Sequence, residues 1–367
     1  MKDTPHEKAG KDFTAGGIHA LSGRRTTTGD TAFDARVDQL VKDWAAKANP
    51  DLIEELIISA LRLAKHDVTV AELKLLNRVC KELRNAWRVF RPYDNRRKIA
   101  IYGSARTHPD MPEAKAAATF ARRMVEEGFM VITGAGDGIM GAAQHGAGRD
   151  NSFGLNIRLP FEQSANDTIE GDAKLISFNY FFTRKLTFVK ESEALALFPG
   201  GFGTMDEGFE VLTLIQTGKS AILPIVMVDA PGGDYWKTFE QFLRNHLLQR
   251  KLISEEDFAL FKITDDVEEA VHEVKNFYRV FHSYRYVKDR IIFRLQRKLS
   301  ERQLAKLNID FADMVKTGLI VQDRALPEEQ DEAAIVHLPR LTFTPHKRNY
   351  GRYREFINAI NDCDPEK

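Results

Sequence analysis

A glycine-rich segment near the middle of the chain restricts the possible folds more than any other part of the sequence. It reads Pro199-Gly200-Gly201-Phe202-Gly203-Thr204-Met205-Asp206-Glu207. The apolar run at 194–198 before it is short enough to be a buried parallel strand. The apolar residues after it recur at helical spacing: Phe209, Val211, Leu212, Leu214 and Ile215. The segment therefore predicts a strand–turn–helix crossing of an α/β sheet.

This turn has the features of a phosphate-binding site. Gly200, Gly201 and Gly203 let the backbone turn tightly and approach a ligand closely. The N–H groups at the start of the following helix have no intrahelical partner, and the helix dipole is positive there. We expect Thr204 both to cap this helix and to donate a hydrogen bond to a phosphate oxygen. The turn is therefore predicted to bind the phosphate of a ligand.

Glu207, at the end of the motif, has two interpretations. A carboxylate near an anion site repels the anion unless the carboxylate faces another part of the ligand. In the simpler interpretation Glu207 is an acid in the first helical turn that complements the helix dipole. In the other, it contacts a different part of a phosphate-bearing ligand. The position of the residue leaves both open.

Two further segments are expected at the same edge of the sheet. Residues 98–103 read as the first buried strand, and Ser104 and Arg106 follow at its carboxyl end, where open α/β sheets bind ligands. Arg106 is either a solvated loop residue or a contact to phosphate or ribose. The other segment, Gly134-Ala-Gly-Asp-Gly-Ile-Met-Gly141, follows a second predicted strand at 129–133.

The segment 134–141 formally matches a dinucleotide-binding fingerprint through Gly136, Gly138 and Gly141, with Glu162 about 20 residues further on. In dinucleotide-binding folds the fingerprint follows the first strand of the unit, whereas here it follows the second. Two interpretations remain. Either the glycines only permit close packing of strand and helix, or the loop borders a nucleotide site.

The motif Pro-Gly-Gly-x-Gly-Thr-x-x-Glu resembles the signature of the LONELY GUY family of nucleoside-5′-monophosphate phosphoribohydrolases, often labelled "possible lysine decarboxylase". Two more elements match that family in the same order: the glycine-rich segment 134–141, and Arg184-Lys185 on a predicted helix at 180–190. The resemblance covers roughly residues 97–280 and leaves both flanking regions unexplained.

The resemblance implies roles for particular residues. Glu207 and Arg184 would be catalytic. The substrate would be AMP or an N6-modified AMP, as in activation of cytokinin hormones, and the protein would be a homodimer or a larger homo-oligomer. Ten residues would bind the substrate: Gly200, Gly201, Gly203, Thr204, Lys185, Ser104, Arg106, Gly134, Gly136 and Gly138.

The predicted organisation has four parts. Residues 1–33 read as a mobile tail, and 34–95 as a helical attachment with helices near 37–44, 52–61 and 69–87. Their apolar faces, including Cys80, are expected in a core, with a partner surface as the alternative. The alternation of strands and helices over 96–280 predicts a Rossmann-like, doubly wound parallel sheet.

The last part, 281–367, is predicted to be an α+β extension. We expect an amphipathic helix at 286–299, a helix that begins at a Ser300/Gln303 capping box, strands at 318–322 and 334–338, and a final helix at 350–360. Four basic side chains there either bind a phosphate-bearing ligand, pair with neighbouring acids or form a solvated face: Lys347, Arg348, Arg352 and Arg354.

Composition narrows the classes of partner. With 53 basic and 53 acidic side chains, the formal charge is zero, which argues against bulk attraction to nucleic acid or an anionic membrane. Two cysteines form no disulfide framework, which suggests a reducing cytoplasm. No apolar run reaches the length of a membrane span, and we find no cluster of metal ligands, so no cofactor is expected.

Three functions compete. The first is hydrolysis of the N-glycosidic bond of a nucleoside 5′-monophosphate to free base and ribose 5-phosphate, with Glu207 supporting the cationic sugar and Arg184 the base or phosphate. The second is a nucleotide or cofactor carrier on the same fold without turnover. The third, amino-acid decarboxylation, would need a pyridoxal-phosphate lysine, for which Lys185 is the available amine.

Overall fold

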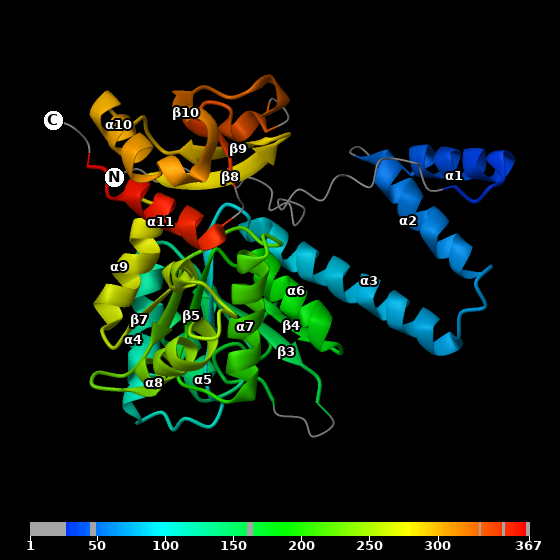
Figure 1. The fold of residues 1–367 in the computed structure, drawn as a ribbon. Helices are drawn as coiled ribbons and strands as arrows, with labels where there is room; N and C mark the ends of the chain where they lie inside the picture. Colours follow the sequence, from blue (N-terminus) through cyan, green and yellow to red (C-terminus); the bar gives the residue numbers. More distant parts are fainter. Residues whose placement is uncertain (1–26, 45–48, 160–163, 330–331, 347–348, 365–367) are drawn as a thin grey trace. The chain divides into compact units, whose positions relative to one another are not determined.

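The computed structural model describes residues 27–44, 49–159, 164–329, 332–346 and 349–364. These residues form two compact units, 27–84 and 85–364 (Figure 1). Most of the predicted tail, residues 1–26, lies outside the described residues, as do Glu162, Lys347 and Arg348. None of the described helices is long and apolar enough to cross a membrane.

A seven-stranded sheet organises the larger unit. Its order is β4-β3-β2-β1-β5-β6-β7, and every neighbouring pair is parallel. The chain therefore has the predicted doubly wound α/β fold. The strands are β1 (Lys98–Tyr102), β2 (Met130–Thr133), β3 (Ser152–Ile157), β4 (Leu175–Phe178), β5 (Ala194–Leu197), β6 (Ile225–Val228) and β7 (Phe261–Thr264).

Helices cover both faces of this sheet because alternate strand residues are apolar on both sides. In β1, Ile99 and Ile101 belong to one buried cluster, whereas Ala100 and Tyr102 belong to the other. The first cluster includes residues of α4 (Pro112–Glu126), α5 (Ile139–Ala147) and α9 (Val267–Phe277). The second includes residues of α6 (Phe181–Glu191), α7 (Phe202–Gln216) and α8 (Tyr235–Phe242).

The C-terminal part forms a second, antiparallel sheet in the order β10-β11-β9-β8. It comprises β8 (Phe281–Val287), β9 (Arg290–Leu295), β10 (Val315–Asp323) and β11 (Arg340–Pro345), with α10 (Glu301–Asp310) and α11 (Tyr350–Asn361) beside it. The Ser300/Gln303 capping box is present at the start of α10 as predicted.

Two predicted elements in this part are wrong. The predicted helix at 286–299 is instead the β8–β9 hairpin, which turns at Lys288 with φ of 54°. The run Ile291–Phe293 is fully buried, and β-branched and aromatic residues favour a strand over a helix. The predicted strand at 334–338 instead begins with a 3₁₀ turn, Ala333–Ile335, and the N–H groups of Ile335 and Leu338 bond locally, to the carbonyls of Glu332 and Ile335.

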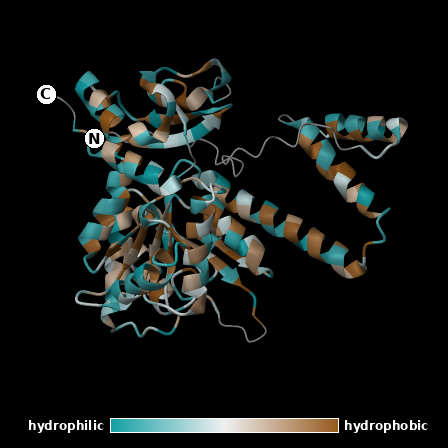
Figure 2. Ribbon diagram, viewed as in Figure 1, coloured by the Kyte–Doolittle hydropathy of each residue, from teal (hydrophilic) through white to brown (hydrophobic). Residues whose placement is uncertain are grey.

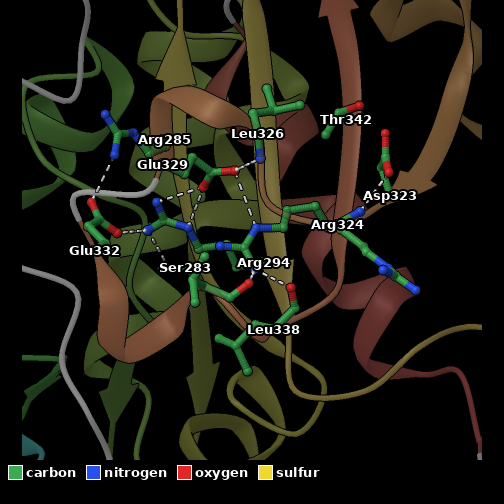
Figure 3. Close-up of polar contacts among 12 residues, drawn as sticks. Ser283, Arg285, Arg294, Asp323, Arg324, Leu326, Glu329, Glu332, Leu338 and Thr342 are labelled. Atoms are coloured by element: carbon green, nitrogen blue, oxygen red, sulfur yellow. Dashed lines mark hydrogen bonds and ion pairs between the residues drawn. The ribbon is translucent and has the colours of Figure 1, made fainter.

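A buried carboxylate holds the antiparallel sheet to the loop that precedes β11 (Figure 3). Glu329 accepts hydrogen bonds from Arg294 at 2.9 and 3.0 Å and from Arg340 at 3.3 Å. Its second oxygen also accepts from the Leu326 backbone N–H at 3.1 Å. All three charged side chains are essentially fully buried, so removing Glu329 would leave Arg340 in the interior without its carboxylate partner.

Helix α11 joins the two sheets of the larger unit. Tyr353, Phe356 and Ile357 are fully buried, and the Phe356 ring packs edge-on against Phe293 of β9 at 5.0 Å. The basic residues of this helix pair with neighbouring acids. Arg352 forms ion pairs with Asp313 and Glu355, and Arg354 pairs with Glu273 in α9. For these two arginines the acid-pairing alternative holds.

The smaller unit contains α1 (Thr31–Asp43), α2 (Pro50–Leu63) and most of α3 (Val70–Phe90), which ends in the larger unit. Thr69 and Glu72 form a capping box at the start of α3. Hydrophobic residues recur along α2 and α3 (Figure 2), yet none of residues 70–81 is buried. The prediction that Cys80 lies in a core is therefore wrong: its stretch of α3 packs too little against other described residues to bury it.

Candidate functional site

Three loops meet at the carboxyl ends of β1, β2 and β5. The Ser104 N–H, after β1, donates to the Pro199 carbonyl after β5 at 3.1 Å. The Ser104 carbonyl accepts from the N–H of Ile139, at the end of the loop after β2, at 3.0 Å. In the sheet, β1 lies between β2 and β5, so the strand order reverses beside it. Ligands of open α/β sheets bind at such a reversal.

The turn after β5 leads directly into α7, whose first residue is Phe202. Gly201 is the N-cap and no side chain caps the helix, so the prediction that Thr204 caps it is wrong. Thr204 is instead the third helical residue, and its hydroxyl packs against Gly200: a Cβ there would lie 2.1 Å from it. A glycine is needed at 200 because the helix begins two residues before Thr204 and folds its side chain back onto the turn.

The other two glycines of the turn have no such requirement. A Cβ on Gly201 or Gly203 would meet no atom within 4 Å, and neither residue has a positive φ. In the described part of the chain, nothing accepts a hydrogen bond from the N–H groups of Gly201, Phe202 or Gly203. These donors lie at the positive end of a helix and are exposed, which suits an anion.

The loop after β2 is tightly built. Gly138 has φ of 62°, and a Cβ on it would lie 2.3 Å from the Ser104 carbonyl oxygen. Cβ atoms on Gly134 and Gly136 would each lie 2.8 Å from the Met140 side chain. For Gly138 above all, close packing accounts for the glycine without a ligand.

Asn166 fixes the shape of this loop from outside. Its side-chain amide donates to the carbonyls of Ala135 at 3.1 Å and Gly136 at 3.0 Å, and to Gln144 at 2.6 Å. Its backbone N–H also donates to the Ala135 carbonyl at 2.9 Å. Ala135 is fully buried with φ of 65°, an unfavourable conformation for a residue with a Cβ. The four hydrogen bonds hold the loop in that conformation.

Arg184, on α6, reaches the same place. One of its terminal nitrogens would lie 3.5 Å from a Cβ on Gly134. Its guanidinium lies over the rings of Phe181 and Phe188, at 5.8 and 5.6 Å from their centroids. The buried Nε has no hydrogen-bond partner among the described residues. A guanidinium with an unused donor is therefore available to a ligand.

Glu207, on α7, is 5% exposed, and no described residue forms a hydrogen bond or ion pair with its carboxylate. Burial raises its pKa to about 7, while the nearby Lys185 and Arg184 oppose that rise. It is the sixth residue of α7, and the first turn of this helix holds no acid. The simpler interpretation, an acid of the first turn that complements the dipole, is therefore wrong.

The remaining predicted site residues differ in their availability. Lys185 pairs with Asp206 at 2.7 Å and Glu210 at 3.0 Å, so its ammonium already has two carboxylate partners. The side chain of Arg106 is exposed, and its N–H donates to the Ser104 hydroxyl at 3.1 Å. No group of three or more His, Cys, Asp or Glu side chains in the described ranges could hold a metal ion.

Sequence reasoning missed three residues around these loops: Asn166, Tyr102 and Tyr235. The Tyr102 ring, at the carboxyl end of β1, packs on Phe188 at 4.8 Å; burial and the Glu207 charge raise its pKa. Tyr235 donates to the Gly200 carbonyl at 2.6 Å. The position of Tyr102 beside Ser104 was an available signal, whereas Asn166 and Tyr235 are joined to the loops only by the fold.

Comparison with known families finds a match to part of the α/β domain. Residues 140–274 match the family described as "possible lysine decarboxylase". The match begins in α5 and ends in α9, so it includes Arg184 and the whole turn at 199–207.

One curated protein similar to part of this chain is the cytokinin riboside 5′-monophosphate phosphoribohydrolase LOG of Oryza sativa subsp. japonica. It is 26% identical over 125 residues, which are 33% of this chain and 51% of the relative. The chain thus spans about half the length of the curated relative that it matches.

Solved structures also resemble the chain. A molybdenum cofactor binding protein from Rippkaea orientalis aligns with a TM-score of 0.36 and 18% identity, over 49% of this chain and 96% of that one. The molybdenum cofactor carrier protein of Chlamydomonas reinhardtii aligns with a TM-score of 0.33 and 18% identity, over the same shares of the two chains.

Proposed function

We propose that the protein hydrolyses the N-glycosidic bond of a purine nucleoside 5′-monophosphate, giving the free base and ribose 5-phosphate. One observation carries the proposal: a buried carboxylate without a partner, Glu207, shares a site with a guanidinium that has an unused donor, Arg184. Burying such groups is costly unless a ligand uses them.

The turn at 200–204 is the proposed site of the 5′-phosphate. Its exposed N–H groups at the start of α7 have no acceptor among the described residues. Glu207 follows Gly203 by four residues, which is about 6 Å along the helix axis. That separation suits the ribose of a nucleotide whose phosphate is bound at the helix start, and it keeps the carboxylate away from the phosphate.

The chemistry follows from these positions. As the bond between C1′ and the base nitrogen breaks, its electron pair moves to the base and positive charge develops on the sugar. The ionised Glu207 stabilises that charge and accepts a proton from the water whose oxygen bonds to C1′. Arg184 anchors the phosphate or ribose, or stabilises the departing base; the base takes up a proton. The remaining predicted contacts, including Lys185 and Arg106, belong to the same proposal.

The proposed identity of the base is based on the curated rice protein that is similar to this chain. The name of the rice protein specifies a cytokinin riboside 5′-monophosphate, which is an N6-modified AMP. We therefore propose AMP or an N6-modified AMP as the substrate of this chain. Decarboxylation is disfavoured because the Lys185 amine is held by two carboxylates, and these keep it protonated and unreactive.

The test is a screen of purine and pyrimidine monophosphates for release of free base, separated by chromatography. We expect release of adenine from AMP, and much slower release from adenosine, because each hydrogen bond to the charged phosphate contributes roughly 1.5–3 kcal/mol. Equal turnover of AMP and adenosine would remove the phosphate assignment. Tight AMP binding without base release from any monophosphate would instead favour a carrier.

We further propose a homo-oligomer, at least a dimer, in the cytoplasm. Three aromatic side chains beside the site are exposed, Phe181, Phe182 and Phe202, and exposed aromatic groups of this kind are common at subunit interfaces. Analytical ultracentrifugation at micromolar concentration tests the assembly: a sedimentation coefficient of a monomer would contradict it.

A further inference from the structure

The backbone of the proposed phosphate turn contains a peptide with little intrinsic preference for one orientation. Gly200 and Gly201 flank this peptide, and neither has a Cβ to restrict its rotation. Gly201 lacks any neighbour within 4 Å of its Cβ position, so packing on that side does not fix the peptide either. Some other contact must select the orientation that the turn adopts.

Tyr235 makes that contact. Its hydroxyl, at the start of α8, donates to the Gly200 carbonyl oxygen at 2.6 Å. The Tyr235 ring is itself held edge-on against the buried Trp236 at 4.9 Å. A peptide is planar and trans, so its C=O and N–H point in opposite directions. Fixing the Gly200 carbonyl toward Tyr235 therefore directs the Gly201 N–H to the opposite side of the turn.

The Gly201 N–H is one of the donors that no described residue uses. If the peptide were reversed, the Gly200 carbonyl would face that side instead, and its partial negative charge would repel an anion. We propose that Tyr235 is a positioning residue, which does not touch the ligand but makes the Gly200–Gly201 peptide a donor to the 5′-phosphate. This inference rests on the proposed phosphate site, and goes beyond it in naming what orients the donor.

The chain contains a matched control at the other end of the same strand. Tyr278 donates to the Glu193 carbonyl just before β5, also at 2.6 Å, whereas Tyr235 acts just after β5. Tyr235→Phe and Tyr278→Phe each remove one hydroxyl and one hydrogen bond to a backbone carbonyl. The two variants differ in which end of β5 they affect, and ligands bind at the carboxyl end.

The experiment measures AMP and adenosine affinity by calorimetry for both variants in a Glu207→Gln background, so that nucleotide is not consumed. Without the Tyr235 hydrogen bond, the Gly200–Gly201 peptide also populates the reversed orientation, which cannot bind phosphate. The apparent affinity for AMP then falls in proportion to the fraction of molecules that keep the binding orientation. We expect Tyr235→Phe to weaken AMP binding about tenfold and adenosine binding less than twofold. Tyr278→Phe should change neither by more than about twofold.

The outcomes separate the inference from the proposed function. Equal losses for AMP and adenosine in Tyr235→Phe, or no loss for AMP, would overturn the positioning role. The positioning role would also be overturned if Tyr235→Phe were unfolded at 25 °C while Tyr278→Phe remained folded. The Tyr235 hydroxyl would then be required for folding rather than for orienting the peptide. Absence of base release by the unmodified protein would overturn hydrolysis alone, since the binding comparison does not depend on turnover.

Discussion

The two glycine-rich loops beside β1 differ in why they contain glycine. In the loop after β2, Gly138 combines a φ of 62° with backbone contacts that leave no room for a Cβ. In the turn after β5, a Cβ on Gly201 or Gly203 would meet nothing, and both residues have backbone conformations open to alanine. Folding explains the first loop, whereas folding does not explain the last two glycines of the second.

The two glycine-rich motifs look alike in sequence but have different roles. The first loop is a packed support whose shape is held by Asn166, and it places Gly134 beside Arg184. The second is an open turn with unused N–H donors, and it leads to Glu207. A glycine that no intramolecular contact requires is best explained by something that approaches the backbone from outside.

The largest expected effect is on the packed loop. Gly138→Ala combines an unfavourable φ with a 2.3 Å approach to the Ser104 carbonyl, so we expect a loss of at least about 3 kcal/mol in unfolding free energy. Gly148→Ala is the control. Gly148 also has a positive φ, 76°, but no atom lies within 4 Å of the position of a Cβ, so backbone strain alone should cost about 1 kcal/mol. Denaturant unfolding of both variants gives the difference. Equal losses of unfolding free energy in the two variants would mean that the loop rearranges to make room for the new methyl group.

A second effect comes from Glu207, on the helix that follows the open turn. Its pKa rises from 4.5 to about 7 on folding, so between these values the folded state binds a proton that the unfolded state has lost. Stability should therefore fall as the pH rises from about 4.5 to 7, by about 3 kcal/mol in total. Glu207→Gln should lack this component. Unfolding curves at several pH values, compared between the two proteins, measure it; parallel curves would contradict the raised pKa.

The open turn should respond to alanine in the opposite way from the packed loop. Gly201→Ala should leave unfolding free energy within about 0.5 kcal/mol, because the new Cβ meets nothing. If phosphate occupies the space in front of the turn, AMP binding should weaken by about 2 kcal/mol, through loss of charge-assisted hydrogen bonds. Calorimetry with AMP tests this. Unchanged AMP affinity in a stable Gly201→Ala protein would show that the space is merely solvent.

The smallest effect is a gain. Gly203 is the second residue of α7, and alanine is a better helix former than glycine by up to about 1 kcal/mol. We expect Gly203→Ala to be as stable as the unmodified protein or slightly more so, yet weaker in AMP binding. The same unfolding and calorimetry experiments apply. A loss of stability would mean that this glycine has a structural role after all.

Much of the α/β domain could be predicted because its strands are short apolar runs bounded by glycine and proline. The C-terminal hairpin could not: Ile291, Leu295 and Leu299 recur every four residues and so imitate a helix. Leu299 lies beyond β9, and the strand conformation of the other two depends on pairing: Ile291 pairs with Phe343 of β11, and Leu295 with Phe281 of β8. For the site, the sequence predicted that the three loops lie at one edge of the sheet, because each follows the carboxyl end of a predicted strand. The role of Tyr235 could not be predicted, because its contact with Gly200 spans 35 residues and depends on how α8 packs.

The central claim is that Glu207 takes part in breaking the glycosidic bond, whereas the neighbouring turn at 200–204 only binds the 5′-phosphate. The most direct measurement is the rate of adenine release from AMP by the unmodified protein and by Glu207→Gln, with AMP binding followed by calorimetry in both. We predict a fall in turnover of at least ~10²-fold while AMP binding persists or tightens, because the substitution removes the proton acceptor and a negative charge near the phosphate. Turnover should also rise with pH through about 7 in the unmodified protein, as the carboxylate ionises. A Glu207→Gln protein with near-native turnover would contradict the claim.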